Sequence, residues 1–233
     1  MSVVHGLAKA AQPQPTGMTK HMKIRRVLLV DDHPIVRQGL RRIVEADPGL
    51  ALAGEAGDAT ALLTALEHTA TDLVLLDVSM PGGLFLETLQ ELRTKHPSVR
   101  VLVLSVHPED QWAVRALRAG ASGYLTKDHS PDQLLEAIRR VYRGGKYVSP
   151  TLAEQLASHL DGGGQRAPHE LLSDREFEVM RRLGSGLTVS QIASELAISA
   201  KTVSTYRAQI LEKMAVATNA DLVRYAARHG LIA

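Results

Sequence analysis

Five side chains suited to phosphoryl chemistry end or follow four separate apolar runs of this 233-residue sequence. They are the carboxylates of Asp31, Asp32 and Asp77, the hydroxyl of Ser105 and the ammonium group of Lys127. If each run is a buried parallel strand, these groups meet at the carboxyl ends of the strands, where open α/β sheets bind ligands. Three crowded carboxylates repel one another and need a cation, and oxygen ligands suit Mg²⁺. The pattern predicts a site that binds Mg²⁺ and accepts a phosphoryl group on Asp77.

The elements that must position these groups lie between about residues 24 and 148. Strand-length apolar runs alternate there with helical patterns five times, which favours a parallel sheet covered by helices on both faces. The predicted strands are 26–30, 50–54, 73–76, 99–104 and 122–125. Pro34, Pro108 and Pro131 suit first turns of helices, and Asp58 and Ser130 suit helix caps.

A second, helical unit follows a linker. Residues 149–170 are predicted to be this linker, with a short helix over 150–160 and a flexible glycine run at 161–164. From residue 171 the pattern indicates four helices, because Ser173, Thr188, Ser199 and Thr218 each stand at a cap position and Gly230 can end the last helix.

Composition narrows the class of protein. The formal net charge is +2 and cysteine is absent, so disulfides, thiolate metal sites and thiol catalysis are excluded. The sequence contains neither an apolar stretch of about 18 residues nor the apolar core of a secretory signal. We expect a soluble cytoplasmic protein without a membrane partner. Residues 1–22 are expected to be a disordered leader, with Met18 and Met22 as alternative starts.

Residues 23–148, with the acidic pair, Asp77, Ser105 and Lys127 in place, resemble the receiver domain of two-component response regulators. From about residue 24 onward, the chain resembles the NarL/FixJ family, which implies an α/β receiver with strand order 2-1-3-4-5 followed by an all-α domain. The resemblance implies that Asp77 is phosphorylated by a sensor histidine kinase. It further implies that Asp31, Asp32, Asp77 and the backbone carbonyl of Ser79 hold Mg²⁺, and that Ser105, Tyr124 and Lys127 form the switch.

Residues 171–233 resemble the LuxR-type helix-turn-helix domain, through the run from Leu172-Ser173-Asp174-Arg175-Glu176 to Gly230-Leu231-Ile232. On the helix over 200–214, Val203, Tyr206, Ile210 and Met214 recur at helical spacing and should face the core. The opposite face suits the major groove of double-stranded DNA. The residues expected to contact DNA are Lys201, Thr202, Ser204, Thr205, Arg207, Ala208 and Lys213. Small residues on the base-facing side suggest shape readout and thymine contacts.

The resemblance implies a homodimer on DNA or when phosphorylated, with RNA polymerase as a further candidate partner. In relatives the last helix, here about 219–229, makes the dimer contact, and Leu222, Ala226 and Ile232 could serve it or could pack the domain. The unphosphorylated receiver is expected to cover the recognition helix. Trp112 could lie on the remodelled receiver face or in a core.

Several points stay open in the sequence. Phe85 stands where relatives usually have glycine, and it would be strained if that position needs a positive φ. His107 and Ser79 could steer a hydrolytic water, and the other histidines show no metal-ligand spacing.

One alternative function is a phosphorylation-independent LuxR-type regulator, and a remote one is a Mg²⁺-dependent aspartyl-phosphate phosphatase. In the leading interpretation the protein is not an enzyme, except that the receiver catalyses its own phosphotransfer and dephosphorylation.

Overall fold

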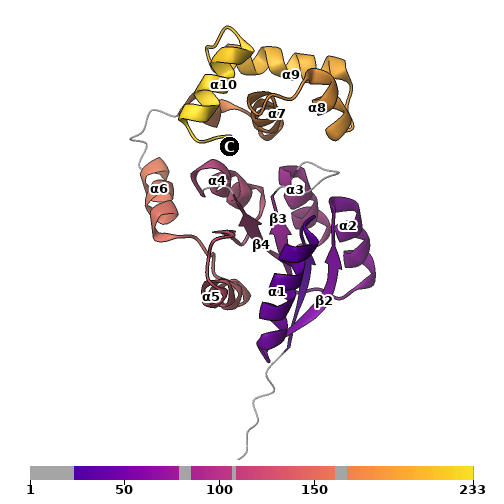
Figure 1. Cartoon of the computed structure of the whole chain (residues 1–233). Helices are drawn as coiled ribbons and strands as arrows, with labels where there is room; N and C mark the ends of the chain where they lie inside the picture. The colour runs from indigo at the N-terminus through magenta and orange to yellow at the C-terminus, as the bar shows by residue number, and fades with distance from the viewer. Residues whose placement is uncertain (1–23, 79–84, 107–108, 161–166, 233) are drawn as a thin grey trace, which may run out of the picture.

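Five parallel strands form one sheet in the order β2-β1-β3-β4-β5, as expected (Figure 1). The computed structural model describes residues 24–78, 85–106, 109–160 and 167–232. The strands are β1 (Arg25–Val30), β2 (Leu50–Ala56), β3 (Leu73–Asp77), β4 (Arg100–Ser105) and β5 (Gly123–Thr126). Each strand end lies within two residues of its predicted position. The largest difference is at the end of β2, an edge strand that is mostly only partly buried.

Helices cover both faces of this sheet. They are α1 (Pro34–Ala46), α2 (Ala59–His68), α3 (Phe85–Lys95), α4 (Glu109–Ala119) and α5 (Pro131–Tyr142). Asp58 caps α2 by accepting from the Ala61 N–H, and Ser130 caps α5 in a capping box with Gln133, as predicted. Helices α1 and α5 share one core with one face of the sheet, and α2, α3 and α4 share a second core with the other face.

The C-terminal domain consists of four helices after the linker helix α6 (Pro150–Leu160) and a 3₁₀ turn, η1 (Pro168–Leu171). These helices are α7 (Asp174–Gly184), α8 (Val189–Glu195), α9 (Ala200–Lys213) and α10 (Asn219–Arg228). All four predicted caps are present, with capping boxes at Ser173, Thr188 and Thr218. Gly230 adopts φ 62°, which suits its predicted place after the last helix.

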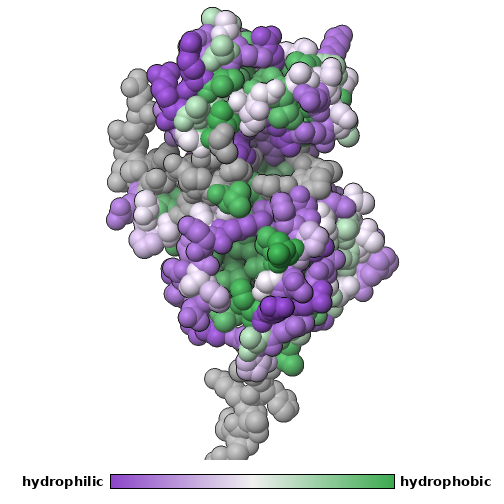
Figure 2. All heavy atoms as spheres, viewed as in Figure 1, coloured by the Kyte–Doolittle hydropathy of each residue, from purple (hydrophilic) through white to green (hydrophobic). Residues whose placement is uncertain are grey.

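The surface in the view of Figure 2 is largely hydrophilic, with small apolar patches over both domains. Within the described ranges, no helix is long and apolar enough to span a membrane. The expected leader, Ser79, His107, Pro108 and the glycine run of the linker lie outside the residues that the structure describes.

Candidate functional site

The strand ends bring the predicted phosphoacceptor residues together. Asp77 is the last residue of β3 and Ser105 the last of β4, while Asp31 directly follows β1 and Lys127 directly follows β5. Because β3 pairs with both β1 and β4, and β4 with β5, these four residues share one edge of the sheet. The convergence inferred from the apolar runs is therefore present.

Lys127 joins two buried carboxylates at this edge. Its ammonium nitrogen lies 2.6 Å from Asp31 Oδ2 and 3.0 Å from Asp77 Oδ2. Both aspartates are about 1% exposed, so their charges have little access to water. Burial acts to lower the pKa of Lys127, but the hydrogen bond to Asp31 and the charge of Asp77 outweigh it and raise that pKa. Lys127 is therefore held as a cation between the two buried carboxylates.

The same cluster has the donor set of a hard divalent cation. One ligand atom each from Asp31, Asp32, His33 and Asp77 lies within 4.8 Å of the others. Three of the four donors are carboxylate oxygens, which is the chemistry that Mg²⁺ prefers. The residues of the described part therefore fit the expected Mg²⁺.

His33 belongs to this cluster, although the histidines of the sequence show no metal-ligand spacing. Its side chain is 61% exposed, as a surface residue should be, yet Nδ1 lies 2.7 Å from Asp32 Oδ1 and 3.4 Å from Asp31 Oδ1. His33 is also the N-cap residue of α1, and its backbone N–H donates to Asp31 Oδ1 at 2.8 Å. Its place directly between Asp32 and Pro34 was the available signal.

Two of the predicted switch residues are fully buried. Ser105 on β4 and Tyr124 on β5 are both about 0% exposed, and they lie on neighbouring strands. The backbone N–H of Lys127 donates to the Ser105 carbonyl at 2.6 Å, so the two predicted phosphoryl contacts belong to one hydrogen-bonded strand end. The switch role itself stays a prediction.

Phe85 does not have the strained backbone that a positive φ would impose. Among the described residues other than glycine, only Ala197 and Ala215 have positive φ. Phe85 is instead the first residue of α3, and its buried ring meets the ring of Trp112 edge to face at 5.6 Å. The concern that Phe85 distorts the phosphoacceptor site through a left-handed backbone is therefore removed.

Helix α9 carries the predicted DNA-facing residues on an exposed face. Val203, Ile210 and Met214 are buried as predicted, and Tyr206 is partly buried. Ser199 caps the helix by accepting from the Thr202 N–H. The exposed set on the opposite side is Lys201, Thr202, Ser204, Thr205 and Ala208.

Two predicted phosphate-contacting cations already have partners within the domain. Arg207 donates to the Asn219 side chain at 2.7 Å, and Lys213 lies 2.8 Å from the buried carboxylate of Glu176. Burial would raise the pKa of Glu176, but hydrogen bonds from Lys213 and Ser173 outweigh it and lower that pKa. Lys213 thus ties α9 to α7, which the sequence pattern did not reveal.

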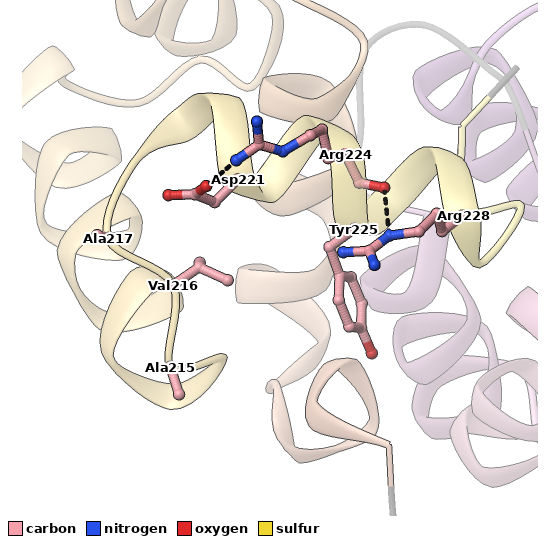
Figure 3. A pocket seen from close by; sticks show the side chains of 7 residues that line it. All are labelled: Ala215, Val216, Ala217, Asp221, Arg224, Tyr225 and Arg228. Atoms are coloured by element: carbon pink, nitrogen blue, oxygen red, sulfur yellow. Dashed lines mark hydrogen bonds and ion pairs between the residues drawn. The ribbon is translucent and has the colours of Figure 1, made fainter.

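The candidate dimer residues of the last helix pack the domain itself. Leu222 and Ala226 are about 0% exposed, so they serve the core. Figure 3 shows a hollow beside α10 whose lining includes Val216, Arg224, Tyr225 and Arg228.

The receiver docks on α7 and leaves α9 open, which corrects the expectation that it covers the recognition helix. In Figure 1, α7 faces α3 and α4, while α9 lies on the far side of the domain. Arg115 of α4 donates to the carbonyls of Leu172 and His169 at 2.9 and 2.8 Å. Trp112 is buried, which confirms the alternative that placed it in a core. One of its ring partners, Phe177, belongs to the other domain.

Comparisons with known proteins agree with both domains. Residues 27–139 match the response regulator receiver domain, and residues 170–226 match the bacterial regulatory proteins of the luxR family. The chain is 38% identical to the response regulator GacA of Pseudomonas viridiflava over 208 residues, which cover 89% of this chain and 97% of GacA.

Solved structures of RcsB share the architecture. RcsB from Salmonella enterica serovar Typhimurium, bound to the promoter rprA in the presence of the phosphomimetic BeF3⁻, matches with a TM-score of 0.68 and 28% identity, covering 87% of this chain and 98% of that chain. A structure of two RcsB dimers bound to two parallel DNAs matches with a TM-score of 0.56 and 26% identity, covering 88% of this chain and 98% of that chain. The chain thus belongs to the NarL/FixJ-type two-component response regulators, in which a receiver precedes a LuxR-type DNA-binding domain.

Proposed function

We propose that phosphorylation of Asp77 by a sensor histidine kinase controls the binding of this response regulator to double-stranded DNA, and thereby transcription. The observation that carries the proposal is the position of Asp77. Its buried carboxylate lies at a strand end, 3.0 Å from Lys127 and within one ligand cluster with Asp31 and Asp32. Such a carboxylate is a nucleophile already surrounded by the groups that stabilise a transferred phosphoryl group.

In the proposed transfer, an Asp77 carboxylate oxygen attacks the phosphorus of a phosphohistidine. The O–P bond of an acyl phosphate forms, the N–P bond breaks, and its electron pair leaves with the imidazole. Lys127 exchanges its present contact with Asp77 for contacts with the phosphoryl oxygens. Asp31, Asp32 and Asp77, with the expected carbonyl of Ser79, would hold Mg²⁺, which would supply charge neutralisation for the transferring group.

The switch would then pass from Ser105 to Tyr124. The Ser105 hydroxyl turns toward the phosphoryl oxygens, and Tyr124 on the neighbouring strand follows into the space that this movement leaves. The phosphorylated state is thereby a shifted population of the same chain.

The output surface is the exposed face of α9. Ser204, Thr205 and Ala208 read the major groove, while Lys201, Thr202 and Arg207 contact phosphates. A homodimer supplies the second half-site, in keeping with RcsB dimers on DNA. We place the chain in the cytoplasm because its DNA, kinase and candidate polymerase partners are found there.

The test is DNA binding at fixed salt, with and without beryllofluoride plus Mg²⁺, for the wild type and Asp77→Asn. The proposal expects activated wild type to bind about 5- to 150-fold more tightly, the usual range of coupling between two sites, while Asp77→Asn does not respond. Equal binding in all conditions would favour phosphorylation-independent regulation instead.

A further inference from the structure

The acidic pair contains a buried oxygen that has no hydrogen-bond partner. Asp32 Oδ1 is closed to solvent and accepts no hydrogen bond from the described residues. The Nδ1 atom of His33 lies 2.7 Å from this oxygen, but the approach does not form a hydrogen bond. A buried carboxylate oxygen without a donor is costly, and a bound cation is one of the few groups that can satisfy it.

The polar contacts of the His33 ring, within the described part of the chain, are all to carboxylates. His33 is the N-cap residue of α1, but its side chain makes no cap hydrogen bond, and the helix uses its backbone carbonyl instead. The ring is largely exposed, so it adds little to packing. Its Nδ1 atom faces one oxygen each of Asp31 and Asp32. An imidazole nitrogen beside two carboxylate oxygens is a donor set for a metal ion.

Asp31 uses its two oxygens for two different neighbours. Lys127 Nζ lies 2.6 Å from Asp31 Oδ2, whereas His33 Nδ1 lies 3.4 Å from Asp31 Oδ1. The backbone N–H of His33 also donates to Oδ1 at 2.8 Å, which fixes the direction of this carboxylate. Three donor atoms therefore gather on the Oδ1 side of Asp31, where Lys127 does not bind. They are Asp31 Oδ1, Asp32 Oδ1 and His33 Nδ1.

The separations of these atoms fit an octahedral cation. Adjacent donors of an octahedron with bonds of about 2.1 Å lie about 3 Å apart. The two distances from His33 Nδ1, 2.7 and 3.4 Å, fall on either side of that value. A donor atom of Asp77 lies within 4.8 Å of the others and can fill a further position.

This mixed donor set distinguishes two classes of divalent cation. Mg²⁺ prefers oxygen ligands and keeps several waters, so it can bind through the carboxylates without an imidazole. Imidazole suits first-row ions such as Co²⁺, Ni²⁺ and Zn²⁺. One nitrogen beside three carboxylates should therefore add affinity for these ions and leave the affinity for Mg²⁺ nearly unchanged.

We propose that His33 is a ligand of the acceptor-site cation through Nδ1, and that it gives this site a preference for divalent transition-metal ions of the Co²⁺, Ni²⁺ and Zn²⁺ class over Mg²⁺. The inference rests on the metal site of the proposed function, formed by Asp31, Asp32 and Asp77. It concerns the choice of cation, whereas the nucleophile of the transfer is still the Asp77 carboxylate.

The test is a competition for this site in the full chain. The protein is loaded with Mn²⁺, and the electron paramagnetic resonance signal of free Mn²⁺ reports its displacement by Co²⁺ or by Mg²⁺. Co²⁺ that binds other histidines of the chain displaces no Mn²⁺, so it does not enter the measurement. The variants are His33→Ala, which removes the ring, and His33→Gln, which keeps a polar side chain. His68→Ala, which removes the exposed last residue of α2, is the matched control.

We expect the dissociation constant of Co²⁺ to rise at least about tenfold in both His33 variants, since removing a residue that merely supports a metal ligand already has an effect of this size. The constant for Mg²⁺ should change by less than about twofold, because Mg²⁺ binds through oxygen. His68→Ala should match the wild type for both ions. An unchanged Co²⁺ constant in His33→Ala overturns the inference, and so does an equal loss for Co²⁺ and Mg²⁺, which would give His33 a purely structural effect.

Failure of the metal site itself gives a different result. A wild-type chain that binds no Mn²⁺, or that binds it equally well after Asp32→Asn, overturns the metal site of the proposed function. Mn²⁺ binding that is lost in Asp32→Asn, together with a Co²⁺ constant that does not change in His33→Ala, overturns only the role of His33.

Discussion

Arg115 on receiver helix α4 lies over the ring of Phe177 on α7, with its guanidinium carbon 4.3 Å from the ring centre. The same guanidinium donates to the carbonyls of His169 and Leu172, so one side chain holds both the turn before α7 and the helix itself. Burial lowers the pKa of Arg115, although Asp174 opposes this shift, so the buried cation depends on its partners. Docking therefore relies on a few desolvated polar contacts around an aromatic centre.

Replacing Arg115 by alanine should separate the domains while leaving each one folded. The variant loses a cation–π contact and three hydrogen bonds, which together contribute about 2–4 kcal/mol to docking. Small-angle scattering should show a larger radius of gyration, and Trp112 emission should shift to the red. Arg118→Ala, on the exposed side of the same helix, is the control. A compact Arg115→Ala chain would contradict this account.

Docking should also weaken as pH rises, through Glu178. Burial raises the pKa of Glu178 to about 7, although Arg182, the Leu86 N–H and Arg175 lower it and Glu87 adds to the rise. The docked state therefore binds the proton more tightly than an undocked state with the ordinary value of 4.5. The stabilisation is full below about pH 4.5, falls by at most about 1.4 kcal/mol per pH unit, and is lost above about pH 7.

Trp112 emission from about pH 4 to 8 measures this dependence, because that range includes both the undocked and the docked pKa of Glu178. The wild type should show a red shift that grows with pH, whereas Glu178→Gln should give a flat profile. Other titrating groups near the junction, such as His169, would leave a slope in Glu178→Gln. If Trp112 emission still depends on pH in Glu178→Gln, a group other than Glu178 causes the pH dependence of docking.

The sequence predicts the structure of each domain better than it predicts the contact between the two domains. The strands and caps follow from local patterns, because a continuous buried run and a Ser or Thr cap each act within a few residues. The acceptor site follows as well, since parallel strands end at a common edge. The contact between the domains does not follow from local patterns. The pattern favours an ordinary core position for Trp112 and a solvated helix position for Glu178, and it does not show that the two faces carrying them meet.

Ala215→Gly should stabilise the DNA-binding domain. Ala215 has φ 52°, and the Ala215 and Val216 N–H groups donate back to Glu212 and Leu211 in the pattern that usually has glycine at this place. Removing the β-carbon relieves about 1 kcal/mol of left-handed strain. Urea unfolding should show a higher midpoint for Ala215→Gly. Ala208→Gly, inside the exposed face of α9, should lower it by a similar amount. A shift of the urea midpoint in the same direction for both substitutions would contradict this explanation.

Lys127→Met should make the receiver depend on Mg²⁺ for stability. The substitution leaves the buried carboxylates of Asp31 and Asp77 without their cation, which costs about 3 kcal/mol. Mg²⁺ can replace that charge, so millimolar Mg²⁺ should raise the melting temperature of Lys127→Met more than that of wild type. Lys95→Met, which removes an exposed lysine paired with Glu91, should show only the wild-type response. Equal stabilisation of all three chains by Mg²⁺ would show that Lys127 does not occupy the role assigned to it.

Lys201 and Lys213 should differ in their effect on DNA binding, although both were expected to contact DNA. Lys201 is exposed in the first turn of α9, whereas Lys213 is engaged 2.8 Å from Glu176. Removing one lysine–phosphate interaction lowers the slope of log K against log salt by about 1. Fluorescence anisotropy with a labelled duplex between about 50 and 200 mM salt should therefore give a shallower slope for Lys201→Ala. Lys213→Gln should keep the wild-type slope but unfold more easily, since buried Glu176 loses its partner. An equally shallow slope in both variants would return Lys213 to the DNA-contacting set and show that its ion pair opens on binding.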